Sequence, residues 1–148
     1  MISKSAATAQ LLAAKKEKGL TFAQIAETVS RDKVWVAAAI MGQTSMSADE
    51  ANATVMSLGL GPEVADALQE IPMKGSLGSP VPVDPLIYRF HEITQVYGTS
   101  MKAVIHELFG DRIMSAIDFE IDIKKEEDPK GDRVVVTYSG KCLPYRKW

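Results

Sequence analysis

The sequence is poor in the features that mark disulfide-linked, metal-binding and membrane proteins. Its single cysteine, Cys142, excludes an intrachain disulfide and fits a reducing compartment. Its two histidines, His91 and His106, combine with that cysteine into no pattern of zinc-ligand spacing. The chain has no apolar run long enough to cross a bilayer and no secretory signal pattern, so we expect a cytoplasmic protein.

An excess of charge of one sign is also missing. The 17 basic and 19 acidic residues give a net charge of −2, which indicates neither a nucleic-acid surface nor a membrane surface. What is present is ordinary: 46% hydrophobic and 24% charged residues are typical of a folded soluble protein. A length of 148 residues is enough for one domain or two small ones.

Residues 1–75 contain the start and stop signals of five short helices. Two capping boxes, Thr21–Gln24 and Ser47–Glu50, each pair a side-chain acceptor with a polar residue three positions later and so begin a helix. Gly61 followed by proline begins the last of the five. Short helices with tight connections predict a compact bundle, followed by a Pro- and Gly-rich linker at 76–84.

The linker leads into a helix that begins at Asp84, because an aspartate cap followed by proline is a strong start signal. We predict that this helix ends at Gly98 and is buried in part by an apolar face that includes Phe90. A separate helix, capped by Thr99, is predicted to continue to Phe109.

The remainder of residues 85–148 changes to a strand period. Apolar and charged residues alternate from Ile117 to Lys124, which indicates a half-buried strand, and Arg133–Ser139 reads as its return strand. Since an isolated two-stranded hairpin is marginally stable in water, we expect this small α+β domain to form an obligate oligomer.

Three stretches of the C-terminal half resemble the C-terminal domain of cyanases (cyanate hydratases). Residues 88–98 read YRFHEITQVYG, residues 109–119 read FGDRIMSAIDF, and residues 132–144 read DRVVVTYSGKCLP. The similarity runs in order through nearly the whole chain. It implies an α+β fold with an N-terminal five-helix bundle, similar to a phage-repressor helix-turn-helix domain, and a C-terminal domain whose β-hairpins intertwine.

The resemblance also implies an activity and an assembly. Cyanases are lyases that decompose cyanate with bicarbonate to carbon dioxide and carbamate, which breaks down to ammonia, in cyanate catabolism and nitrogen metabolism. Bicarbonate is a co-substrate, and we expect no metal or other cofactor. The family's enzymes are homodecamers, built as five dimers, with active sites between subunits, and the resemblance implies the same here.

By the motif match, the catalytic residues are Arg89, Glu92 and Ser115, of which Arg89 and Ser115 bind the substrate anions. Cyanate and bicarbonate repel each other, and a planar guanidinium fork suits planar oxyanions. Glu92 would hold the guanidinium and take part in proton transfer, and Ser115 would donate a hydrogen bond. One arginine cannot balance two anions, so we expect copies of Arg89 from different subunits to meet.

Judged by spacing alone, these residues are explained equally well by ordinary structural roles. Arg89 and Glu92, three positions apart on a helix, form a common type of ion pair, and Ser115 alone is typical of a turn or cap. Two departures from the family pattern also stand near them. His91 occupies a position that is usually aromatic, and Arg112 occupies a position that is usually glycine, where we expect its charge to attract anions.

Two other functions compete with the lyase interpretation. Residues 20–60 resemble a repressor-type helix-turn-helix. Its second helix, Lys33–Met41, would have to contact the DNA bases but is almost wholly apolar, which disfavours a DNA-binding regulator. Nucleophilic hydrolysis by Ser115 would require an adjacent base, and no nucleophile-elbow pattern surrounds this serine. Because bicarbonate itself attacks cyanate, the lyase reaction needs no enzyme nucleophile.

Overall fold

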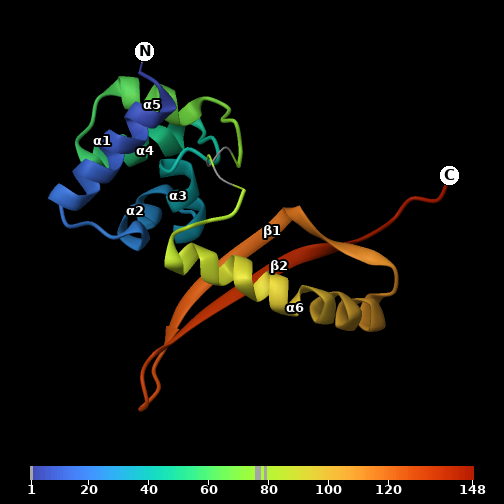
Figure 1. The fold of residues 1–148 in the computed structure, drawn as a ribbon. Coiled ribbons are helices and arrows are strands. Elements are labelled where there is room, and N and C mark those ends of the chain that lie inside the picture. The colour runs from blue at the N-terminus through green and yellow to red at the C-terminus, as the bar shows by residue number, and fades with distance from the viewer. Residues whose placement is uncertain (1, 76–77, 79) are drawn as a thin grey trace. The chain divides into compact units, whose positions relative to one another are not determined.

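The computed structural model describes residues 2–75, 78 and 80–148. Within these residues the protein has an α+β fold of six helices and one two-stranded antiparallel sheet (Figure 1). The helices are α1 (Lys4–Glu17), α2 (Phe22–Val29), α3 (Lys33–Ile40), α4 (Ala48–Leu58), α5 (Pro62–Gln69) and α6 (Pro85–Phe109), and the strands are β1 (Arg112–Glu126) and β2 (Arg133–Pro144). Of the predicted linker 76–84, residues 76, 77 and 79 lie outside the described residues.

The chain divides into two compact units. Unit 1 contains Met1–Ser76 and Ile121–Val136, and unit 2 contains Leu77–Glu120 and Thr137–Trp148. Among the described residues, no helix is long and apolar enough to span a membrane.

Helices α1–α5 of unit 1 surround one apolar core, seen as the blue-to-green helices in Figure 1. Leu11, Val36 and Ile40 are completely buried, and each comes from a helix with apolar residues at helical spacing. The buried hydroxyl of Thr54 is satisfied because it donates a hydrogen bond to the Glu50 carbonyl oxygen at 2.8 Å.

Both predicted capping boxes are confirmed. The Thr21 N–H donates to Gln24 Oε1 at 2.8 Å, and the Gln24 N–H donates back to Thr21 Oγ1 at 3.1 Å. At the start of α4 the Ser47 N–H donates to Glu50 Oε2 at 2.8 Å, and the Glu50 N–H donates to Ser47 Oγ at 3.3 Å. These bonds satisfy backbone donors that a helix leaves unpaired at its first turn.

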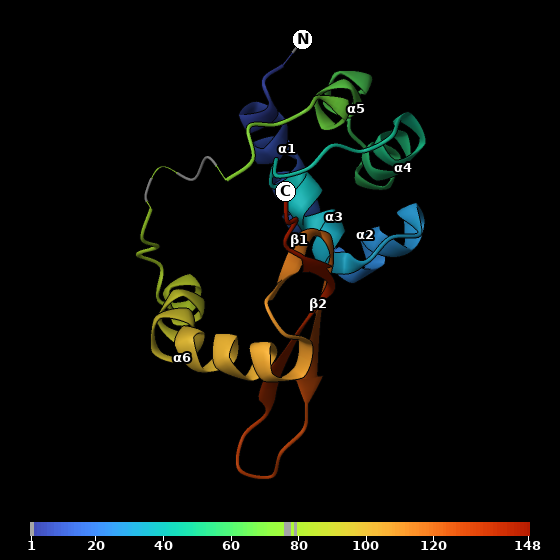
Figure 2. The same ribbon diagram turned by 90° about the vertical axis from the view of Figure 1, so that its right-hand side faces the viewer.

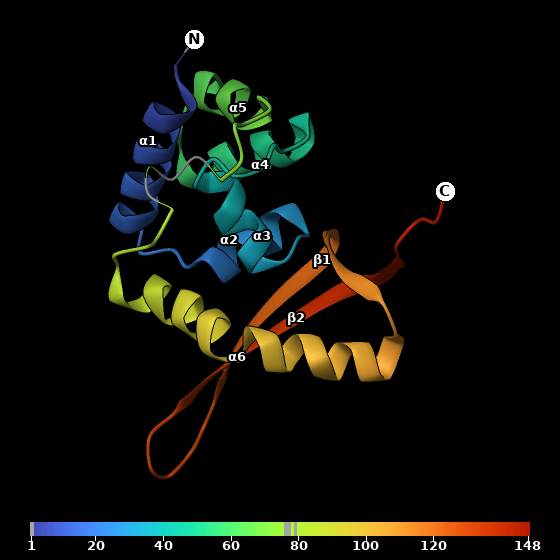
Figure 3. The ribbon, with the colours of Figure 1, turned by 45° about the vertical axis from the view of Figure 1, so that its right-hand side comes forward.

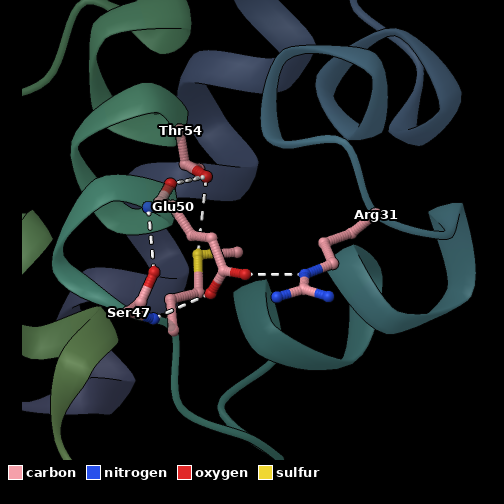
Figure 4. A network of polar contacts seen from close by, with 5 residues as sticks. Arg31, Ser47, Glu50 and Thr54 are labelled. Atoms are coloured by element: carbon pink, nitrogen blue, oxygen red, sulfur yellow. Dashed lines mark hydrogen bonds and ion pairs between the residues drawn. The ribbon is translucent and has the colours of Figure 1, made fainter.

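Glu50 also links two parts of unit 1, as Figure 4 shows. Its Oε1 accepts a hydrogen bond from Arg31 Nε at 2.6 Å, so the turn between α2 and α3 is tied to the first turn of α4. The Ser47 backbone N–H and the Arg31 guanidinium lower the pKa of the Glu50 carboxyl group, whereas partial desolvation opposes this shift.

Helix α6 of unit 2 is continuous through Gly98, so the prediction of two helices was wrong (Figure 2). Gly98 does not adopt the positive φ of a helix-ending glycine, and Thr99 lies inside the helix rather than capping a new one. A glycine within a helix costs only about 1 kcal/mol relative to alanine. In return, the continuous helix keeps the intrahelical hydrogen bonds that two new helix ends would give up.

The predicted partial burial of this helix is slight in the single chain: Tyr88, His91 and Glu92 are half-buried, and no residue of α6 is fully buried. Ile87, Phe90, Ile93 and Tyr97 lie on the predicted apolar face, and their exposed fractions range from 38% at Phe90 to 57% at Tyr97. The apolar face therefore exists as predicted, but unit 2 of one chain does not cover it.

Strands β1 and β2 pair along a hairpin and extend beyond the predicted limits (Figure 3). β1 begins at Arg112, before the predicted start at Ile117, so Ser115 lies inside the strand rather than in a turn or cap. Across the hairpin, the rings of Phe119 and Tyr138 are in contact, with centroids 5.7 Å apart. Aromatic pairs of this kind stabilise cross-strand register.

Candidate functional site

The position of Arg89 and Glu92 follows from the way α6 begins. Asp84 Oδ1 accepts hydrogen bonds from the backbone N–H groups of Leu86 and Ile87, both at 3.0 Å. Pro85 occupies the first helical position, where its missing N–H has no cost. This fixed start places both residues of the candidate site within the first turns of the helix, three positions apart.

Arg89 and Glu92 form the predicted ion pair. Arg89 Nη1 donates to Glu92 Oε2 at 3.0 Å, and the two side chains are 64% and 46% exposed. Within the described part of the chain, this is the one ion pair that Arg89 makes, and it uses a single guanidinium nitrogen. Nη2 and Nε therefore remain available for an oxyanion, which a guanidinium can grip at two points.

Ser115 is the one buried residue in the described part of unit 2, with 7% of its surface exposed. Its Oγ accepts hydrogen bonds from the backbone N–H groups of Ile117 at 3.1 Å and Asp118 at 2.9 Å. A hydroxyl oxygen has two acceptor lone pairs and one hydrogen, so both acceptor positions are occupied and the hydrogen can donate to a further group. The arrangement suits a hydrogen-bond donor.

The same geometry gives no support to a nucleophilic Ser115. In the described residues no histidine, aspartate or glutamate side chain hydrogen-bonds its hydroxyl, whereas a nucleophilic serine needs a base at that distance. No hydrogen bond or ion pair of the described side chains joins Ser115 to Arg89 or Glu92. The chain brings the arginine and the glutamate together and leaves the serine separate from them.

Two neighbouring residues depart from the family pattern. Arg112 is the first residue of β1, is exposed, and does not adopt a positive φ, so the strand accepts an arginine where a glycine was expected. Within the described chain it makes no ion pair, which leaves its charge open to solvent. His91 lies beside Tyr88 of the same helix, with ring centroids 5.8 Å apart.

Gly140 of β2 is a residue that the sequence analysis missed. A Cβ atom built at this position would overlap the carbonyl oxygen of Ser115 and Cγ of Met114. A glycine inside a strand often marks a close approach of two backbones, and this was the available signal in the sequence.

The described residues include no group of three or more His, Cys, Asp or Glu side chains that could hold a metal ion. The charged side chains that the structure brings together at the candidate site are Arg89 and Glu92, of which the arginine can bind an anion directly.

Two family models cover most of the chain. Residues 4–72 match a model described as "Cyanate hydratase, N-terminal", and residues 79–147 match one described as "Cyanate lyase C-terminal domain". Because the N-terminal match is also to a cyanate hydratase model, the alternative of a helix-turn-helix regulator gains no support.

Individual relatives agree with the family models over almost the full length. A cyanate hydratase of Synechococcus sp. (strain CC9311) is 57% identical over 99% of this chain and 97% of its own length. One from Synechocystis sp. (strain ATCC 27184 / PCC 6803 / Kazusa) is 59% identical over 97% of this chain and 96% of its own length. The crystal structure of a cyanase from T. urticae superimposes with a TM-score of 0.85 at 43% identity, covering 94% of this chain and 97% of that one.

The fold and these matches define the protein as an enzyme of the lyase class. More particularly, the chain belongs to the cyanate lyase (cyanate hydratase) family, as its sequence resemblance predicted.

Proposed function

We propose that this protein decomposes cyanate in a bicarbonate-dependent reaction. The observation that carries the proposal is its similarity to cyanate hydratases, at 57% identity over 99% of the chain. In the proposed reaction, bicarbonate adds to cyanate, and the adduct takes up a proton and splits into carbon dioxide and carbamate. Carbamate then takes up a second proton and releases ammonia and a second carbon dioxide. The reaction needs no metal or other cofactor, and it would serve cyanate detoxification in the cytoplasm.

Arg89 is proposed to bind the substrate anions. Joining two monoanions places two negative charges in one intermediate, so the site must supply positive charge and hydrogen-bond donors. The guanidinium of Arg89 has one nitrogen engaged with Glu92, and its remaining donors can grip an oxyanion. The planar guanidinium of arginine can donate two parallel hydrogen bonds to one oxyanion, which the ammonium group of lysine cannot do.

Glu92 is proposed to position that guanidinium and to take part in proton transfer. The 3.0 Å bond from Arg89 Nη1 restricts the rotation of the arginine side chain. Because the proposed adduct must gain a proton before it splits, a carboxyl group beside the guanidinium that binds the anion is suitably placed to take part in this transfer.

Ser115 is proposed to donate its hydroxyl hydrogen to a substrate anion. The two N–H groups on its Oγ occupy the acceptor positions of the oxygen and leave it to act as a donor. Bicarbonate is the attacking group in this mechanism, so the absence of a base beside Ser115 in the described residues agrees with the proposed role.

The complete site is proposed to form between subunits. Arg89 is exposed, no residue of α6 is fully buried, and unit 2 buries no apolar side chain among its described residues. A unit of this composition needs other chains to cover its apolar face. We propose a homodecamer of five dimers with intertwined hairpins, in which copies of Arg89 meet. Residues 85–148 would form the catalytic domain, joined by the linker 76–84 to a repressor-like domain at 1–75 that serves packing.

The direct test is to mix the purified protein with cyanate, with and without bicarbonate, and to measure ammonia. Bicarbonate-dependent ammonia release is the expected result, and no release under either condition would refute the proposed function. A gel-shift assay with genomic DNA fragments should show no binding, because the chain has a net charge of −2 and an apolar helix α3.

A further inference from the structure

Gly140 lies directly against the backbone of Ser115. An added Cβ would overlap the Ser115 carbonyl oxygen and Met114 Cγ, and it would come within 3.2 Å of Met114 Sδ. Atoms of folded proteins do not approach this closely, because interiors are packed at van der Waals contact. A residue with a side chain at position 140 therefore requires both the backbone at Ser115 and the Met114 side chain to move.

Position 140 needs glycine for space rather than for backbone conformation. Gly140 is not one of the glycines with a positive φ, so alanine can adopt its backbone angles. The side chain of Met114 can turn aside because it is flexible and 40% exposed. The Ser115 carbonyl oxygen belongs to the backbone of a paired strand and cannot turn aside in this way.

Displacement of this carbonyl would change the surroundings of the Ser115 hydroxyl. The N–H groups that hold Oγ come from Ile117 and Asp118, only two and three positions further along the same strand. Hydrogen bonds weaken with small changes in length and angle, so a shift of a few tenths of an ångström at Ser115 alters both bonds and the direction of the O–H group.

We propose that Gly140 is a positioning residue for Ser115. Its missing Cβ lets β2 hold the Ser115 backbone at the place where two N–H groups fix the hydroxyl as a donor to the substrate anion. This inference rests on the proposed function, in which Ser115 donates to that anion.

The first test compares Ser115→Ala, Gly140→Ala and the double variant in the ammonia assay. Removing one preorganised donor lowers kcat about 100-fold in comparable sites, and we expect both single variants to lose activity on this scale. If Gly140 acts through Ser115, the double variant should stay within about threefold of Ser115→Ala, since coupled residues are not additive. Losses that multiply would overturn the proposal.

A second pair of variants separates the backbone contact from the packing of Met114. Met114→Ala together with Gly140→Ala removes the side-chain overlap and keeps the overlap with the Ser115 carbonyl. Its activity should remain about 100-fold below that of Met114→Ala. Activity equal to that of Met114→Ala would overturn the proposal.

A third measurement does not depend on turnover. Amide hydrogen exchange at Ile117 and Asp118 should be faster in Gly140→Ala than in the parent, because both N–H groups bond to Ser115 Oγ. Gly98→Ala is the matched control, since its added Cβ would meet only Thr94 Cγ2 at 3.8 Å. It should show parental activity and parental exchange at Ile117 and Asp118.

The exchange measurement also separates the two proposals. An inactive parent, with exchange still faster in Gly140→Ala, would refute the proposed function and leave the positioning of Ser115 supported. An active parent with unchanged exchange and activity in Gly140→Ala would refute the positioning role alone.

Discussion

Arg89 is the residue whose chemistry can be tested most directly. Lysine at this position keeps the positive charge but replaces a planar fork of five donors with a compact ammonium group. We expect Arg89→Lys to lower kcat/KM for cyanate by about 100-fold or more, because the lost donors are those proposed to bind the reacting anions. The measurement is bicarbonate-dependent ammonia release by assembled protein.

Arg133→Lys provides the matched control for this substitution. Its guanidinium lies 3.9 Å from Asp128 beside the hairpin turn and is also largely exposed. Exposed pairs of this kind contribute little, so the control should retain activity within about twofold. Full activity in Arg89→Lys would remove Arg89 from the proposed role.

Arg112 is expected to act at longer range than Arg89. It is exposed and, among the described residues, makes no ion pair, so its charge adds to the field met by an approaching anion. Arg112→Gly should lower kcat/KM for cyanate and bicarbonate severalfold at low ionic strength, and less at high salt, where charges are screened. Rates measured across a salt series test this prediction, and unchanged salt slopes for both substrates would contradict it.

At the scale of whole elements, Glu50 is expected to make the stability of unit 1 depend on pH. The Ser47 N–H and the Arg31 guanidinium lower its pKa in the folded protein, so its carboxylate stabilises the fold at every pH above the ordinary pKa of an unfolded glutamate. This contribution should disappear as the pH falls through the folded pKa. Glu50→Gln keeps an acceptor for Ser47 but loses the charge that pairs with Arg31, a loss of about 1 kcal/mol or less.

The corresponding measurement is Tm between pH 7 and pH 3. Glu50→Gln should melt below the parent at pH 7, and the two curves should converge as the acid limit is approached. Gln24→Ala, which alters the other capping box without removing a titratable group, should lower Tm by a similar amount throughout. A constant gap between Glu50→Gln and the parent across this range would show that the charge is not responsible.

Local interactions explain which elements the sequence could predict. The capping boxes at Thr21 and Ser47 depend on residues three positions away, and both were predicted correctly. The continuity of α6 through Gly98 depends on whether backbone groups find partners beyond the immediate sequence, and there the prediction failed. The length of β1 likewise depends on its pairing with β2, and the strand is longer than the segment of alternating residues that predicted it.

The features of the candidate site also divide into one that local sequence predicts and others that depend on strand pairing. The Arg89–Glu92 pair is an i, i+3 contact on one helix, so the sequence predicted it. The burial of Ser115 and the close approach of Gly140 depend on how β1 and β2 pair, which no local pattern specifies. The resemblance to a known family predicts a role for Ser115 and does not give the reason for the direction of its hydroxyl group.

At the scale of the whole molecule, the proposed sharing of sites between subunits can be tested with mixed assemblies. Arg89→Lys and Ser115→Ala should each give nearly inactive homo-oligomers. When the two variants are coexpressed with different tags and purified through both, some sites should combine an intact Arg89 from one chain with an intact Ser115 from another. We therefore expect activity well above that of either homo-oligomer, because neither residue contacts the other within the described chain. As a control for the effect of mixing, two differently tagged copies of Arg89→Lys are coexpressed and purified through both tags. Verified mixed assemblies that stay as inactive as the homo-oligomers would mean that each site draws Arg89 and Ser115 from the same chain, or that every copy of Arg89 that meets in a site must be intact.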